Sequence, residues 1–240
     1  MTAVVDRVAP PVGPHPPWIV ALSSLLNSRF SCRAFRTEPV PRGTIEQILS
    51  AAQRTATWCN TQPWQVYVTA PPATDRLRKE LYEHASMLPA SAPDIPWPRE
   101  YRGVHLQRRR DAGFSLYRAL GIGRDDGRAR QRQLLENYRF FGAPHMLLVT
   151  TDEALGPYAY LDCGGYVANF LLAARAHGVD TCAQAAIAHH APFVRQHLKI
   201  PDGQTIVCGI SFGYADVSHP ANGFRLGRAG LAEAVHWVDH

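Results

Sequence analysis

Residues 145–176 read HMLLVTTDEALGPYAYLDCGGYVANFLLAARA, and this stretch decides the fold class. Its beginning, His145–Thr150, is a compact apolar run typical of a buried strand, whereas Tyr158–Ala176 has the length and composition of a buried helix. Trp64–Thr69 and Thr205–Phe212 have the same β-rich character as the first run. Because only three or four strands alternate unevenly with helices, the sequence predicts an α+β fold, a sheet flanked by helices, rather than a doubly wound one.

The other elements follow from helical spacing and from the positions of proline and glycine. Gly178 is expected to end the long helix, and Val179–Ala183 begins a strand or an extended loop. Apolar spacing predicts further helices at Trp18–Leu26, from Pro41 to about Thr55, at Asp75–Ala85, and in an arginine-rich stretch that ends near Leu120.

Two segments are predicted to lie outside the core. Residues 1–17 are rich in proline and poor in periodic apolar positions, which predicts an extended N-terminal arm ahead of a single domain over residues 18–240. Four prolines between Pro89 and Pro98 exclude a regular element there. We therefore expect residues 88–130 to form an insertion or a lid over the core.

Composition narrows the class of protein. The 240 residues are 46% hydrophobic, no run of eighteen apolar residues occurs, and prolines interrupt the N-terminus, so we expect a cytoplasmic protein that does not enter a membrane. The five cysteines are scattered, which argues against a disulfide framework and against a metal site. The net charge of +5 comes mostly from arginine and favours anionic ligands. The run Arg108–Arg110 lacks the pattern of a nucleic-acid site and is interpreted as a solvated helix face.

Three motifs imitate other functions. Gly209–Gly213 matches the Gly-x-Ser-x-Gly elbow of hydrolases, but turn residues rather than a helix start follow it, so Ser211 is expected to be a strand residue with a satisfied hydroxyl. Gly121–Gly123 imitates a dinucleotide fingerprint, yet no strand precedes it and it predicts a loop. The neighbouring His189 and His190 point apart and are interpreted as solvated or capping residues, not metal ligands.

Three separated segments carry groups suited to a phosphorylated, polar ligand. Arg29-Phe30-Ser31-Cys32-Arg33 alternates two arginines with a hydroxyl, so an extended chain would project all three to one side as an anion cradle. The loop Thr55–Trp64 carries hydroxyls and amides that donate and accept hydrogen bonds. Asn222–Arg228 adds two arginines on a glycine-broken loop, for which surface ion pairs are the simpler interpretation.

Together these segments resemble the nitroreductase family of FMN enzymes, from about Leu22 to Val238 with an interruption at 88–130. The matching motifs are Arg29–Phe35, the Asn-x-Gln-Pro-Trp loop at Asn60–Trp64, and Gly209–Tyr214 with Asn222, Arg225 and Arg228. The resemblance implies a central, mostly antiparallel sheet flanked by helices, and an intertwined homodimer that binds FMN.

The resemblance also assigns the site residues. Within one subunit FMN would be bound by Arg29, Phe30, Ser31, Arg33, Asn137, Arg139, Gln184, Ala185, Ala186, Arg225 and Arg228. Of these, Arg29, Ser31, Arg225 and Arg228 would hold the phosphate, and Arg33 would face the pyrimidine edge, where a cation stabilises the anionic reduced flavin.

The partner subunit would add a second set of flavin contacts, from Ala56, Thr57, Trp58 and Asn60. The bulky Trp58 stands where the family commonly has a small residue, which predicts a narrower wall or a displaced loop. No side chain is expected to act as a catalytic nucleophile. Cys59 is interpreted as a bystander thiol, since no base is identifiable near it.

The implied reaction is hydride transfer from NAD(P)H through flavin N5 to a small acceptor, with ping-pong kinetics. The segment around Tyr117–Asp126 resembles the subgroup linked to nitrobenzoate-like acceptors, and the lid is cationic, so we expect a nitroaromatic with a negative group, contacted by Tyr101, His105 and Arg109. Reductive dehalogenation and enone or quinone reduction remain open, as do flavin storage without turnover and the preference for NADH or NADPH.

Overall fold

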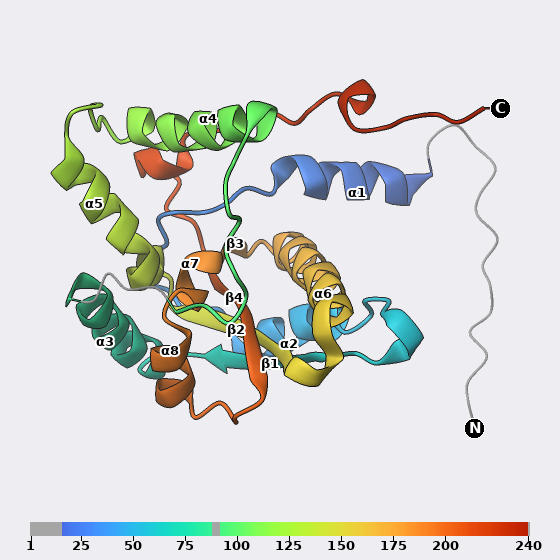
Figure 1. Ribbon diagram of the computed structural model, residues 1–240, viewed down its shortest axis with the longest axis horizontal. Coiled ribbons are helices and arrows are strands. Elements are labelled where there is room, and N and C mark those ends of the chain that lie inside the picture. The colour runs from blue at the N-terminus through green and yellow to red at the C-terminus, as the bar shows by residue number, and fades with distance from the viewer. Residues whose placement is uncertain (1–15, 88–91, 240) are drawn as a thin grey trace.

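The computed structural model describes residues 16–87 and 92–239, and in them one four-stranded sheet lies between two layers of helices (Figure 1). The strands are β1 (Trp64–Thr69), β2 (His145–Asp152), β3 (Asp180–Gln184) and β4 (Gln204–Gly213), in the order β1-β2-β4-β3. Every neighbouring pair is antiparallel. The predicted α+β fold with a mostly antiparallel sheet is therefore confirmed.

The central strand β2 is buried on both faces, as its apolar sequence predicted. Met146 and Leu148 point into one apolar core, whereas Leu147 and Val149 point into the other. This alternation is the period-two geometry of a strand. Because both faces of β2 are buried, Met146–Val149 are all apolar.

Two groups of helices cover the two faces of the sheet (Figure 1). One face packs against α3 (Ala73–Met87), α8 (Ala191–Leu198), the short α7 (Ala185–Ala188) and the 3-10 segment η2 (Glu136–Gly142). The other packs against α2 (Arg42–Ala52) and α6 (Gly156–Ala176), through side chains such as Ile48, Tyr166 and Phe170. The long helix predicted at Tyr158–Ala176 is thus a core element, and Gly178 follows it with φ 71°.

Three helices lie outside this sandwich: α1 (Pro17–Ser28), α4 (Gly103–Ala119) and α5 (Gly127–Leu135), none of which has a buried residue. Figure 1 shows α1 and the C-terminal segment extending to the right, while α4 lies along the top of the molecule and α5 runs down its left side. None of the helices in the described ranges is long and apolar enough to cross a membrane.

The predicted elements agree with the structure to within a few residues, with some differences. The arm expected over residues 1–17 falls almost wholly outside the described residues, and Pro17 already begins α1. The helices α5, α7 and α8 were not predicted. The interpretation of His190 as a solvated or capping residue is wrong, because its side chain is buried and makes no cap hydrogen bond at the start of α8.

Candidate cofactor site

The N-terminal arginine segment is fixed in an extended form between the sheet edge and the C-terminal loop. Ser31 forms a parallel bridge to Thr181 at the start of β3, and the Cys32 N–H donates to the Thr181 carbonyl at 2.9 Å. Four residues later Phe35 bridges Ala215, just beyond β4. The extended conformation expected for Arg29–Arg33 is present, and it leaves the side chains of Arg29 and Arg33 half-buried.

Asn222 joins this segment to the C-terminal loop through three hydrogen bonds. Its Oδ1 accepts from the Arg33 N–H at 2.7 Å, and its Nδ2 donates to the carbonyls of Ala34 and Asp216, each at 2.8 Å. The side chain is only 6% exposed, so these groups have little water to replace a lost partner. The geometry of the two arginine segments therefore depends on this one amide.

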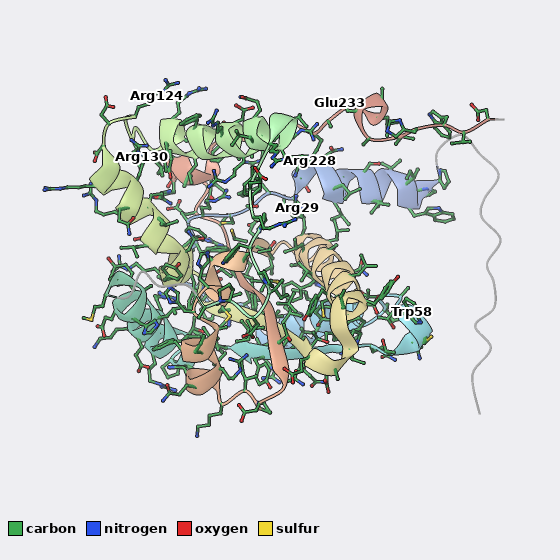
Figure 2. The ribbon with its side chains drawn as sticks, in the orientation of Figure 1. Arg29, Trp58, Arg124, Arg130, Arg228 and Glu233 are labelled. Carbon is green, nitrogen blue, oxygen red and sulfur yellow. The ribbon has the colours of Figure 1, made fainter. Side chains whose placement is uncertain are left out.

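Four arginines meet in a cavity between the two segments. We call it the arginine pocket; its volume is about 90 Å³ and its lining is Arg29, Phe30, Ser31, Arg33, Ala221, Phe224, Arg225, Leu226 and Arg228. Figure 2 shows Arg29 and Arg228 near the C-terminal end of α1. The Arg225 guanidinium lies 3.9 Å from the centre of the Phe30 ring, and Arg228 Nη1 donates to the Gly227 carbonyl at 3.0 Å.

The positive charge of the arginine pocket has no ion-pair partner among the described residues. Within residues 16–87 and 92–239, none of its four arginines forms an ion pair with a carboxylate, so the surface ion pairs considered for the C-terminal loop do not occur. Guanidinium groups collected around one cavity without acidic partners suit a phosphate, whose oxygens accept charge-assisted hydrogen bonds. The Ser31 hydroxyl in the same lining adds a further donor.

A second group of predicted residues surrounds the end of β3. The amide of Gln184, 3% exposed, donates to the Asn137 carbonyl at 2.9 Å and accepts a hydrogen bond from the Ser211 hydroxyl. Ser211 is thus a strand residue with a satisfied hydroxyl, as predicted. Asn137 is hydrogen-bonded to Gln184, whereas the exposed Arg139 pairs with Glu136 at 3.4 Å and lies over the ring of Tyr82.

The turn Ala185–Ala186 is fixed because α7 packs closely on β4. A Cβ atom at Gly209 would overlap Ile187 Cδ1 and lie 3.1 Å from Ile187 Cβ. Glycine at this position of β4 therefore lets Ile187 enter the core, where it is fully buried. Ala185 itself stays exposed.

The loop Ala56–Asn60 is remote from the arginine pocket within the chain. Figure 2 places Trp58 on the far side of α6 from Arg29 and Arg228. The Trp58 N–H donates to Asp162 Oδ2 at 3.2 Å, and its ring packs edge-on against Tyr158 at 4.2 Å. Cys59 and Asn60 both have positive φ, so this loop has an unusual, specific shape.

The three predicted acceptor contacts lie at the start of α4. Tyr101, His105 and Arg109 are exposed, and the Arg109 guanidinium stands 5.1 Å from the centre of the Tyr101 ring. An ion pair of 2.9 Å between Arg108 and Glu233 brings this end of α4 to the C-terminal segment, next to Arg228.

Two buried cysteines beside the arginine pocket, Cys32 and Cys182, have raised pKa values. Burial raises the pKa of Cys182 to about 11, although the charges of Arg33 and Arg29 act in the opposite direction. Burial likewise raises the pKa of Cys32 to about 12.

Comparison with known proteins identifies the scaffold. The model of the Nitroreductase family matches residues 26–214 of the chain. The chain belongs to the nitroreductase family. Its Arg29–Arg33 segment and its β3–α7 turn both lie within the matched range.

Individual relatives of this nitroreductase-family chain cover nearly all of it. "Nitroreductase NfnB" of Mycolicibacterium smegmatis is 37% identical over 230 residues, 95% of this chain and 97% of the relative. A "4-nitrobenzoate reductase" of Nocardioides is 36% identical over 208 residues, 85% of this chain and 84% of the relative. The crystal structure of the FMN-dependent nitroreductase NfnB from Mycobacterium smegmatis in complex with NADPH superposes with a TM-score of 0.88 at 36% identity, covering 92% of this chain and 99% of that one.

Some residues of the nitroreductase site were not assigned from sequence. Ala221, Phe224 and Leu226 line the arginine pocket, and Asn222, which the resemblance named only as part of a matching motif, connects its two segments. Phe224 and Leu226 are adjacent to Arg225 in the sequence, so their place in the lining could have been predicted from it. Nothing in the sequence indicated that Asn222 bonds a backbone group 189 positions away.

Proposed function

We propose that the chain is an FMN-dependent oxidoreductase that takes reducing equivalents from NAD(P)H and passes them to a nitroaromatic acceptor with ping-pong kinetics. The observation that carries this proposal is the arginine pocket, where four guanidinium groups from opposite ends of the chain line one cavity and form no ion pair with a described carboxylate. Two relatives support it, one named an FMN-dependent nitroreductase in complex with NADPH and one a 4-nitrobenzoate reductase.

The residues present fit FMN. Arg29, Ser31, Arg225 and Arg228 would hold the phosphate, and Arg33 would face the pyrimidine edge of the ring. Further toward the ring, the contacts would be Phe30, Asn137, Gln184, Ala185 and Ala186. When bound, FMN supplies the two-electron chemistry, so the side chains bind and orient it and need form no bond with the substrate.

Anaerobic reduction tests this function. We expect the purified protein to be yellow with bound FMN, to lose the flavin absorbance on addition of NADPH or NADH, and to regain it when nitrobenzene is added. A yellow protein that neither nucleotide bleaches would be a flavin-binding protein without turnover, and the proposal would be wrong.

A homodimer would complete the site. Part of α1 is apolar and exposed, with Trp18, Val20 and Leu26 each more than half exposed, and Leu161 of α6 is 70% exposed. Apolar faces of this kind on a folded chain mark interfaces. The remote loop of Ala56, Thr57, Trp58 and Asn60 would then contact the flavin of the partner subunit.

Changing Leu26 to Arg is expected to shift the protein from dimer to monomer, because a charge in the apolar face of α1 would lose its hydration on association. The mass measured by light scattering on a sizing column checks this. Met87→Arg is the control, since Met87 is 77% exposed at the end of α3. A dimer unaffected by Leu26→Arg would show that α1 lies outside the interface.

The acceptor is expected to carry a negative group that the lid recognises. Arg109 forms no ion pair among the described side chains and lies against Tyr101, so it offers a free cation beside an aromatic ring. Arg109→Gln should raise the KM for 4-nitrobenzoate about 1.5-fold to fivefold, the range that corresponds to one exposed charge contact, and leave the KM for neutral nitrobenzene unchanged. Equal changes for both acceptors in steady-state assays would exclude recognition of the carboxylate by Arg109.

A further inference from the structure

A second arginine cluster lies in the lid, away from the arginine pocket. Where α4 ends and α5 begins, a cavity of about 290 Å³ is lined by Phe114, Tyr117 and Ile122 together with Arg118, Arg124 and Arg130. We call it the lid pocket. Figure 2 shows Arg124 and Arg130 at the opposite end of α4 from Arg228.

The three arginines of the lid pocket have no carboxylate partner in the part of the chain that the structure describes. This distinguishes them from Arg102, Arg108 and Arg139, which pair with Glu100, Glu233 and Glu136. The Nε atom of Arg130 is buried and has no hydrogen-bond acceptor in the described residues. A buried guanidinium donor without an acceptor costs free energy, which a bound anion would remove.

The apolar side of the lid pocket suits a flat ring. Phe114 and Tyr117 line it from α4, and the Arg124 guanidinium stands 5.4 Å from the centre of the Phe114 ring. A ligand that places an aromatic ring against Phe114 and an anionic group among the arginines would satisfy both sides of the cavity. The shared chemistry is therefore an aromatic ring with an anion near its edge.

Two ligands in the proposed reaction have this chemistry, a carboxylated nitroaromatic acceptor and NADPH, and the position of the lid pocket distinguishes between them. Arg130 lies on α5 about two helical turns before Asn137, which corresponds to about 10 Å along the axis, and Asn137 is the residue hydrogen-bonded to Gln184. A single-ring acceptor lying against Gln184–Ala186 would not extend that far. A dinucleotide extends over this distance, because its nicotinamide and its adenosine are at opposite ends of the molecule.

We infer that the lid pocket binds the adenosine 2′-phosphate end of NADPH, with Arg118, Arg124 and Arg130 around the phosphate and Phe114 against the adenine. This inference rests on the proposed function, in which a reduced nicotinamide is the electron donor. It makes the protein specific for NADPH over NADH, because NADH has a hydroxyl where NADPH has the dianionic phosphate.

The test uses adenosine 2′,5′-bisphosphate, which has no nicotinamide and cannot reduce the flavin, so it reports binding alone. By calorimetry the FMN-loaded protein should bind it about tenfold or more tightly than 5′-AMP, and Arg124→Gln with Arg130→Gln should remove that difference. Arg128→Gln, an exposed position of α5 outside the lid pocket, is the matched control. In steady-state assays the double variant should lower kcat/KM for NADPH relative to NADH about tenfold.

Other outcomes overturn the inference. Equal affinity for bisphosphate and 5′-AMP, or equal losses in the Arg128 control, would exclude a 2′-phosphate site in the lid pocket. Loss of 4-nitrobenzoate binding with bisphosphate binding intact would assign the pocket to the acceptor instead. Failure of the proposed function is separate, because it appears as flavin that neither nucleotide bleaches, whatever the bisphosphate affinity.

Discussion

Replacing Arg29 and Arg228 together with alanine is expected to weaken FMN binding by about a hundredfold or more. Each charge-assisted hydrogen bond to a phosphate contributes about 1.5–3 kcal/mol, so losing contacts from two guanidinium groups corresponds to at least about two powers of ten in Kd. These side chains have no acidic partner within the described chain, so the loss reflects the ligand and not a broken internal ion pair.

Titration of the apoprotein with FMN, followed by quenching of flavin fluorescence, measures the effect. Arg76→Ala is the matched control, since Arg76 is exposed on α3 and does not line the arginine pocket. A double variant that keeps the parent's affinity for FMN would show that the phosphate lies elsewhere.

The second large effect is expected from Asn222→Leu. Leucine has a similar size but no polar group, so the Arg33 N–H and the carbonyls of Ala34 and Asp216 would lose their partners in a place that water reaches poorly. We expect the free energy of unfolding of the apoprotein to fall by about 3 kcal/mol, and FMN binding to weaken as the two arginine segments separate.

Urea denaturation of the apoprotein, without flavin, isolates the effect on stability. Asn169→Leu provides the comparison, because the exposed Asn169 amide makes one hydrogen bond, to Thr55 Oγ1 at 2.7 Å. We expect that variant to lose no more than about 1 kcal/mol. Similar losses in both variants would mean that Asn222 does not have the special structural role assigned to it.

The core of the fold was predictable because its sequence patterns are unambiguous. Met146–Val149 alternates between two buried faces, and the apolar content of α6 identifies a helix packed on the sheet. The helix α5 has the sequence GRARQRQLL, in which the only large apolar residues are the last two, so no apolar stripe indicated it. The helix α8 did carry a signal, because Pro192 stands in its first turn.

The site was predictable where it depends on residue type, and less so where it depends on long-range packing. The alternation of Arg29, Ser31 and Arg33 was enough to propose an anion cradle. The role of Asn222 comes from hydrogen bonds between distant segments, and the ring of His190 packs against His84 of α3 and Tyr138 of η2. Arg118, Arg124 and Arg130 become one cluster only because the chain turns between α4 and α5.

The central claim is that the arginine pocket recognises the phosphate of FMN. Comparing the affinities of the apoprotein for FMN and for riboflavin tests it most directly, because the two ligands share the ring and the ribityl chain and differ only in that phosphate. Four guanidinium groups that line one cavity predict that riboflavin binds at least about a hundredfold more weakly. Equal affinity for the two flavins would contradict the account.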